Sequence, residues 1–206
     1  VGYKLPELLR HRCGFGPAVS ETLFGDDNEQ DALIYALYSA ALSRKIGVDD
    51  LTRILEACGA YPDAIRSTQD SLRRLPSSPP VEDAFILLDR RSPPSLFDGL
   101  GDRIRPVHSW AQAALVLHAR GRLGGRGWVQ VAEACCQGNI TLEQALPAWL
   151  QDAVRRRLVD KLQARAAIED GVFTPSVVQR AEQTLARLGS LPAEPPPQPF
   201  EPMTWL

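Results

Sequence analysis

The chain has 206 residues, enough for one large domain or two small ones, and its composition is ordinary for a globular protein. Its formal net charge of −2 at pH 7 gives no global field that would attract nucleic acid or an anionic membrane. No apolar run is long enough to span a bilayer and no leader of the secretory type opens the chain, so we expect a cytoplasmic protein without membrane insertion.

The four cysteines predict no disulfide framework. Cys13, Cys58, Cys135 and Cys136 form no C-x-x-C pair, and two neighbouring cysteines rarely bridge each other. We expect reduced, buried thiols, typical of a cytoplasm-like compartment. Because the chain begins with Val1, we also expect it to be a piece of a longer protein.

Helical spacing dominates the first part of the chain. Leu33 and Leu37 belong to an apolar stripe with the period of an α-helix. Good candidates for its N-cap are Asp26, Asp27 and Asn28. Gly47 is expected to end this helix. The spacing predicts helices over 28–45, 49–58 and 62–75.

Two Pro/Ser-rich breaks, at 76–80 and 92–95, divide the chain near its middle. Between them lies the apolar run 84–88, where a strand competes with a helix. We prefer a short helix, because the run stands among helices and has no obvious strand partner. The breaks are the best candidates for a boundary between two halves.

The second half is also predicted to be helical. Thr141 and Gln144 have the spacing of a capping box, and Pro147 lies so deep that the helix either begins at Leu146 or kinks there. Thr174 precedes Pro175 as a cap and a first-turn proline. The expected helical segments cover 105–123, 128–138, 141–171 and 175–189.

The last 17 residues, 190–206, contain six prolines and are expected to form an extended arm. Exposed apolar side chains on such an arm usually dock, because burial of each is worth roughly 1.5–3 kcal/mol. The arm can cross its own domain, insert into a groove of another protein, or stay disordered. Its candidate docking residues are Phe200, Met203, Trp205 and Leu206.

Residues 36–59 align without gaps with residues 113–136, with five identities in 24 positions. The shared features are a glycine that ends a helix and the packing residues of the helix that follows. We interpret the two stretches as one helical hairpin built twice. A helix-turn-helix that reads DNA is less favoured, because Asp49 and Asp50 would repel phosphate at the start of the second helix in the first copy.

Two groups of cations are candidate binding residues. Arg120, Arg122 and Arg126 form a basic turn that could meet a phosphate or an acidic partner. The second group lies at i, i+4 and i+8, which on one helix would form a stripe for an acidic protein surface or a solvated face. Its members are Arg157, Lys161 and Arg165.

No catalytic, cofactor or metal site is predicted. His11, His108 and His118 lack the spacing of paired metal ligands, and no phosphate loop, nucleophile elbow or dinucleotide fingerprint occurs. Cys13 beside His11 could be an activated thiol, but it is better explained as the end of a helix.

The sequence therefore predicts an all-α protein: two packed multi-helix bundles or an irregular α-α superhelix, with a Pro-rich extended C-terminal arm. The expected parts are a first bundle, a connecting region, a second bundle and the arm, at 1–78, 79–105, 106–189 and 190–206. The expected function is a non-enzymatic protein–protein interaction module, such as an adaptor, scaffold or chaperone-like subunit, without a cofactor. The alternatives are a nucleic-acid-associated protein that uses 120–126 and 155–165, and an enzyme with a non-local site. The oligomeric state is left open.

Overall fold

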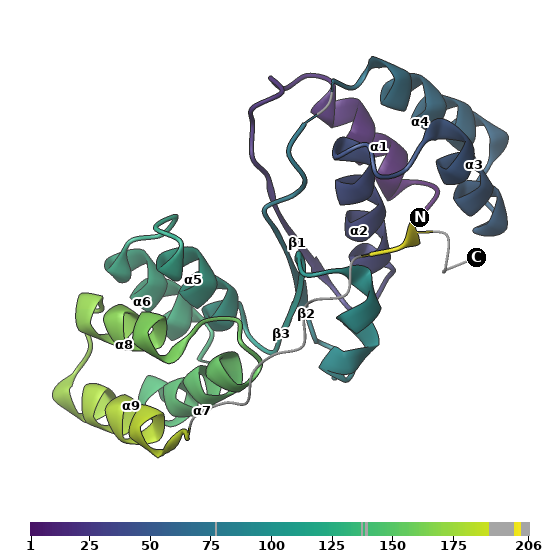
Figure 1. The fold of residues 1–206 in the computed structure, drawn as a ribbon. Coiled ribbons are helices and arrows are strands. Elements are labelled where there is room, and N and C mark those ends of the chain that lie inside the picture. The colour runs from purple at the N-terminus through teal and green to yellow at the C-terminus, as the bar shows by residue number, and fades with distance from the viewer. Residues whose placement is uncertain (77, 137, 139, 190–199, 203–206) are drawn as a thin grey trace. The chain divides into compact units, whose positions relative to one another are not determined.

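The computed structural model describes residues 1–76, 78–136, 138, 140–189 and 200–202 (Figure 1). The chain divides into two compact units. Unit 1 is formed by Val1–Pro106 together with Pro196–Leu206, and unit 2 by Val107–Pro195. Unit 1 is therefore discontinuous in the sequence, and its second piece comes from the end of the chain.

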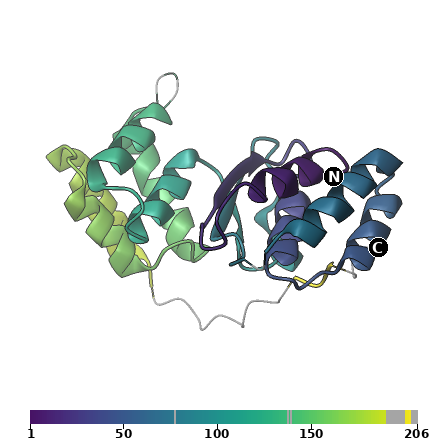
Figure 2. The same cartoon turned by 90° about the horizontal axis from the view of Figure 1, so that it is seen from above.

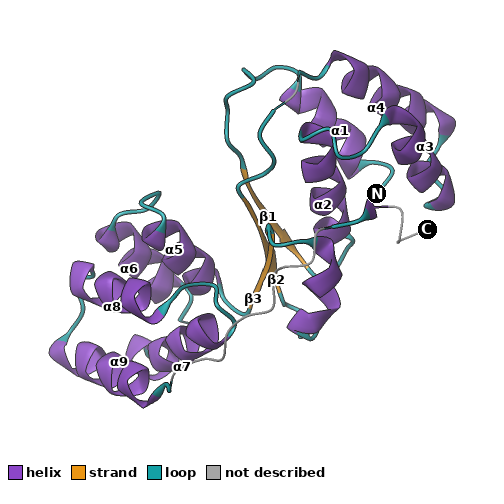
Figure 3. Cartoon of the chain, viewed as in Figure 1, coloured by secondary structure: helices purple, strands orange, loops and turns teal. Residues whose placement is uncertain are grey.

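Unit 1 combines helices with strands, which Figure 3 distinguishes by colour. Its elements are α1 (Lys4–Arg12), β1 (Thr22–Asp26), α2 (Asp31–Leu42), α3 (Val48–Ala57), α4 (Pro62–Arg74), β2 (Asp83–Leu87), the 3-10 helix η1 (Pro94–Leu100) and β3 (Ile104–Val107). Helix α1 packs along α4, as the views in Figures 1 and 2 both show. The predicted connecting region, 79–105, thus supplies two strands and a 3-10 helix.

The prediction of an all-α protein is only partly right: the chain is mostly helical but contains a small parallel sheet of order β1-β2-β3. The run 84–88, expected to be helical, lies almost entirely in β2. This strand pairs in parallel with β1, in a register that places Phe24 opposite Phe85. A central strand is buried on both faces and has a continuous apolar run, which periodicity cannot distinguish from a buried helix.

Helix α2 forms the centre of the core of unit 1. It is buried around most of its circumference, and Leu37 and Tyr38 are fully enclosed. Ala84 and Ile86 of β2 belong to the same apolar cluster. The packing of α2 against β1 and β2 fixes the start of this helix near the carboxyl ends of both strands.

The outer edge of β1 is partly closed by a side chain from α2. The hydroxyl of Tyr35 donates a hydrogen bond of 2.8 Å to the carbonyl oxygen of Phe24. A strand at the edge of a sheet presents backbone groups that other chains can pair with, and a bond of this kind protects one of them.

In the described residues, unit 2 is built from five helices: α5 (Trp110–Ala119), α6 (Gly125–Ala134), α7 (Leu142–Arg155), α8 (Lys161–Asp170) and α9 (Pro175–Arg187). The capping box predicted for Thr141 and Gln144 is confirmed at the start of α7. Helix α7 continues through Pro147, so the expected start at Leu146 is wrong. At the centre, Trp128 is fully buried, donates from Nε1 to the carbonyl oxygen of Ala111, and meets the ring of Phe173 edge-on.

Three helix-to-helix connections have the same local geometry. Helices α2, α5 and α7 each continue into a residue with positive φ, two positions after the helix ends. These residues are Arg44 (φ 57°), Gly121 (φ 68°) and Arg157 (φ 57°). In each case the next helix begins four residues later and is 10 residues long.

The backbone hydrogen bonds at these helix ends are equivalent as well. Each helix ends with a bond that spans five residues, the pattern of a Schellman motif. The bonds run from Lys45 to Ala40, from Arg122 to Leu117 and from Leu158 to Ala153, with N to O distances of 2.9, 2.8 and 2.9 Å. The first two lie at equivalent positions of the aligned stretches 36–59 and 113–136. A duplicated hairpin stays a prediction, but the two stretches form the same turn.

The cysteines are unpaired, but their predicted burial is wrong. Cys13 and Cys58 are exposed, and Cys135 and Cys136 are half-buried. All four lie at or just after helix ends, and Cys13 is the C-cap of α1, as the sequence predicted. The described helices include none with the length and apolar character needed to cross a membrane.

Candidate functional site

Charged side chains gather where β1 ends and α2 begins. Lys4, in the first turn of α1, places its Nζ 2.7 Å from Asp31 Oδ1 and 2.6 Å from Glu29 Oε2. The hydrogen bonds to Asp31 and then to Glu29 raise the pKa of Lys4. Asp31 is buried, whereas Glu29 is exposed. We call Lys4, Asp26, Asp27, Glu29 and Asp31 the strand-end cluster.

Asp31 lies directly over Gly25, the residue before the last one of β1. A Cβ atom at Gly25 would stand 2.5 Å from Asp31 Oδ2 and 2.9 Å from Cε2 of Tyr35. Burial raises the pKa of Tyr35, and the nearby charges of Asp31 and Asp26 raise it further while Lys4 lowers it. Glycine is therefore required here by the close approach of α2 to the strand.

Asp26 and Asp27 do not cap a helix that begins at residue 28, as the sequence predicts, because α2 begins at Asp31. Asp26 ends β1 and accepts a hydrogen bond of 2.8 Å from the backbone of Asn28. Asp27 accepts bonds of 2.8 and 3.1 Å from the backbone N–H groups of Arg90 and Ser92, after β2. Burial raises the pKa of Asp27, but these bonds outweigh it and lower the pKa.

The strand-end cluster has four carboxylates and one ammonium group, so its local charge is negative. It lies at the carboxyl ends of parallel strands, where open α/β sheets most often bind ligands. Among the described residues, no group of three or more His, Cys, Asp or Glu side chains could hold a metal ion. The cluster therefore has an excess of negative charge, and its described residues form no preformed metal site.

A second feature of unit 1 is a cavity of about 320 Å³ beside Phe200, which we call the arm groove. One wall is a row of small side chains at i, i+3, i+4 and i+7, on one face of α2 and its C-cap residue. These are Ala36, Ser39, Ala40 and Ser43. The other wall comes from Leu100 to Ile104, at the end of η1 and the start of β3.

Phe200 belongs to the Pro-rich arm and forms part of the groove wall. Its side chain is half-buried and packs against the apolar core of unit 1. Gly101, with a φ of 89°, lies under it: a Cβ atom there would be 3.2 Å from the Cβ of Phe200. Positive φ and this contact both favour glycine at position 101.

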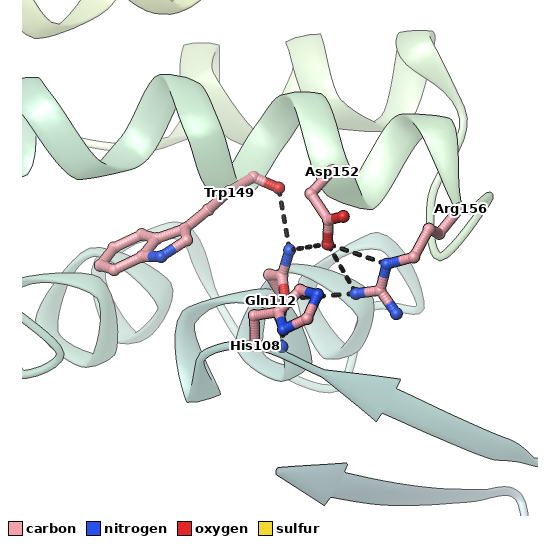
Figure 4. A network of polar contacts seen from close by, with 5 residues as sticks. All are labelled: His108, Gln112, Trp149, Asp152 and Arg156. Carbon is pink, nitrogen blue, oxygen red and sulfur yellow. Dashed lines mark hydrogen bonds and ion pairs between the residues drawn. The ribbon is translucent and has the colours of Figure 1, made fainter. Parts of the chain in front are cut away.

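In unit 2, a polar network joins α7 to the start of α5 (Figure 4). Gln112 is 1% exposed and donates from Nε2 to the carbonyl oxygen of Trp149 at 3.1 Å and to Asp152 Oδ2 at 2.7 Å. Its Oε1 accepts a bond of 2.8 Å from the backbone N–H of His108. Arg156 Nη2 lies 2.6 Å from Asp152 Oδ2. With its amide fully hydrogen-bonded, Gln112 acts as a structural joint.

The basic turn predicted at 120–126 lies between α5 and α6. Arg120 and Arg122 precede α6, and Arg126 lies in its first turn. The side chains or backbones of Arg120 and Arg122 make further contacts within the protein, so these two residues are not free cations. Their use as a binding surface stays a prediction.

The predicted cationic stripe does not lie on one helix. Arg157 stands in the turn after α7, whereas Lys161 begins α8. Lys161 Nζ donates a bond of 3.0 Å to the carbonyl oxygen of Leu188, and Arg165 Nε lies 3.3 Å from Glu182 Oε2. Two of the three cations thus hold α8 to the region of α9, and binding of a partner or nucleic acid by them stays a prediction.

The arm residues divide between described and undescribed positions. Phe200 lies against unit 1 of its own chain, which is the first of the predicted alternatives. Met203, Trp205 and Leu206 lie outside the described residues.

Sequence reasoning did not find the strand-end cluster. Lys4 and Asp31 are 27 positions apart, and their pairing depends on how α1 packs against α2. The available signal is the short β-type run Thr22 to Phe24, followed at once by glycine and two aspartates. Such a run predicts polar groups at a strand end only if a parallel sheet is expected.

Comparison with known proteins adds no relative. No protein-family model, no curated protein and no solved structure matches the chain.

Proposed function

We propose that this chain is a non-enzymatic protein–protein interaction module, in which unit 1 takes up an aromatic residue from an extended segment. The supporting observation is the position of Phe200, which packs against Gly101 and the core of unit 1. All of unit 2 separates Phe200 from that core in the sequence. The chain thus contains an intramolecular example of the binding that we propose.

The expected strength of this contact suits a reversible interaction. Full burial of a phenylalanine side chain is worth roughly 1.5–3 kcal/mol, which alone corresponds to binding weaker than millimolar. A tether supplies an effective concentration in the millimolar range, so the arm needs contacts beyond the ring, such as those of Glu201, to occupy its site within one chain. A partner segment needs additional contacts to displace it, and the arm groove beside Phe200 has room for them.

The test uses the full chain with Phe200→Ala, which removes the internal ligand without removing the arm. A fluorescently labelled peptide with the sequence of residues 196–206 is added, and its anisotropy is measured. We expect the peptide to bind the variant at least several-fold more tightly than the unchanged chain, because the site is then unoccupied.

Two controls belong to this experiment. A peptide with alanine in place of Phe200 should not bind the variant. A chain with Phe15→Ala, which truncates an exposed phenylalanine elsewhere in unit 1, should behave like the unchanged chain. Equal affinity of the native peptide for all chains, or no binding to any, would contradict the proposal.

A second candidate function is the binding of a small cationic ligand at the strand-end cluster. It is supported by the four carboxylates of the strand-end cluster, of which only Glu29 and Asp31 are paired with its one ammonium group, that of Lys4. The ligand could be a hydrated divalent cation, which needs only one or two protein carboxylates, or an organic amine. The two kinds of ligand are both cations, and testing each one separately distinguishes them.

Thermal unfolding with and without magnesium chloride or putrescine tests this candidate. We expect the effective ligand to raise the Tm of the unchanged chain and not that of Asp26→Asn. Asp70→Asn, which alters an exposed ion pair on α4, is the matched control and should keep the response. Equal shifts in all three proteins would point to a general salt effect and remove the candidate.

A further inference from the structure

The rim of the arm groove carries more positive than negative charge. Lys45 and Arg103 line it together with one carboxylate, that of Asp102. Asp102 Oδ1 is 3.7 Å from Arg103 Nε, so these two neighbours largely offset each other. Lys45 is exposed, and its ammonium group makes no hydrogen bond or ion pair with the described part of the chain.

The arm segment that lines this groove has the complementary chemistry. Phe200 supplies an apolar ring, and the residue that follows it is the acidic Glu201. Glu201 is exposed, and it also makes a contact within the protein. The internal ligand therefore has an aromatic ring and a carboxylate on adjacent residues.

We infer that the arm groove recognises an acidic aromatic segment, in which an aromatic residue is followed at once by a carboxylate. This inference rests on the proposed function and names its class of partner. The aromatic ring packs against Gly101 and the core. The net positive charge of the rim favours a carboxylate on the next residue of the bound segment. Charged groups near an interface contribute chiefly to specificity, and their effect falls as salt screens them.

The inference is tested by changing the charge of the peptide and measuring its binding to the Phe200→Ala chain. Three labelled peptides with the sequence of residues 196–206 are compared: the native one, one with Glu201→Gln and one with Glu201→Lys. We expect affinity to fall about two- to fivefold for the neutral peptide and further for the basic one, because exposed ion pairs have effects of this size. The differences should shrink when the salt concentration rises from low to high.

The same three peptides are then measured with a double variant of the chain, Phe200→Ala with Lys45→Glu. The ranking should reverse, so that the Glu201→Lys peptide binds more tightly than the native one. Arg66→Glu, on the exposed surface of α4, is the matched control and should leave the original ranking unchanged. A circular dichroism melt confirms that each variant is folded.

The outcomes separate the two proposals. If all three peptides bind the Phe200→Ala chain equally, with no change on Lys45→Glu, the groove takes aromatic segments without regard to charge and this inference is wrong. If the peptides do not bind at all, the proposed function fails as well. A ranking that also reverses with Arg66→Glu would assign the effect to the general charge of unit 1 and would overturn the inference.

Discussion

Arg44 and Arg91 have nearly the same unusual backbone, with φ of 57° and 60°. A left-handed conformation costs a residue other than glycine roughly 1–2 kcal/mol. The two side chains differ: Arg44 donates to the carbonyl oxygens of Leu72, at 3.0 Å, and Leu75, at the end of α4. The side chain of Arg91 makes no hydrogen bond or ion pair with described residues.

This contrast predicts opposite effects of the same substitution. Arg91→Gly should stabilise the protein by up to about 1 kcal/mol, because glycine relieves the backbone cost. Arg44→Gly should destabilise it by about 1 kcal/mol. The substitution removes charge-assisted hydrogen bonds worth about 1.5–3 kcal/mol and leaves the carbonyl groups of Leu72 and Leu75 without this partner, which outweighs the relief of the backbone. Urea unfolding of both variants measures the difference, and effects of the same sign would refute the argument.

Gly25 gives a second prediction at the residue scale. Gly25→Ala should cost about 1–3 kcal/mol, because its methyl group would overlap Asp31 and Tyr35. Gly16→Ala is the matched control, since a Cβ atom there meets nothing within 4 Å. Comparable urea midpoints for both variants would show that α2 can move away from β1 at little cost.

At the scale of elements, the joint between α5 and α7 depends on Asp152. Burial raises the pKa of Asp152, but hydrogen bonds from Arg156 and Gln112 outweigh it, so the folded pKa is lowered. A carboxyl with a lowered folded pKa stabilises the fold above its unfolded pKa, about 3.9 for aspartate. That stability is lost as the pH falls through the folded pKa, which lies below this value.

We therefore expect Asp152→Asn to destabilise unit 2 at pH 7, by an amount that shrinks as the pH falls below about 4. Urea unfolding at a series of pH values, followed by tryptophan fluorescence, measures it. Asp63→Asn, on an exposed side chain of α4, should show little effect at any pH. A constant cost of Asp152→Asn down to pH 3 would mean that the carboxylate charge contributes nothing.

An element could be predicted from the sequence where its signal lies within or next to the element itself. Thr141, Thr174 and Pro175 are local signals, and helices begin directly after or at them. Strand β2 has no such signal, because its partners lie about 20 to 60 residues away and its apolar run also fits a helix. The spacing of Arg157, Lys161 and Arg165 suggested one helix only because the turn between α7 and α8 was not recognised.

At the scale of the whole molecule, the sequence predicts local features more readily than the contacts between distant segments. The docking of an aromatic residue of the arm could be expected from its composition, whereas its site beside Gly101 could not. Unit 1 takes Lys4, Asp31 and Phe200 from three distant segments. Local patterns hold no information on such contacts, which depend on how the helices pack around the sheet.

The matching turns make one segment of unit 1 and one of unit 2 interchangeable. Residues 43–47 can be replaced by the sequence of residues 120–124, which supplies glycine at the left-handed position and leucine for Ile46. We expect the graft to keep the boundaries of α2 and α3, and a second graft that retains Arg44 to recover the stability lost with its side chain. Hydrogen exchange of the two helices measures this, and loss of protection throughout α3 would contradict it.

Such an exchange treats the turn as a transplantable component. The same five residues would stop one helix and start the next in either sequence context, and the surrounding core would need to accommodate only one altered aliphatic side chain. Two surfaces with different charge could then be interchanged without redesign of the helices, which is how a single chain can acquire new contacts while its architecture is preserved.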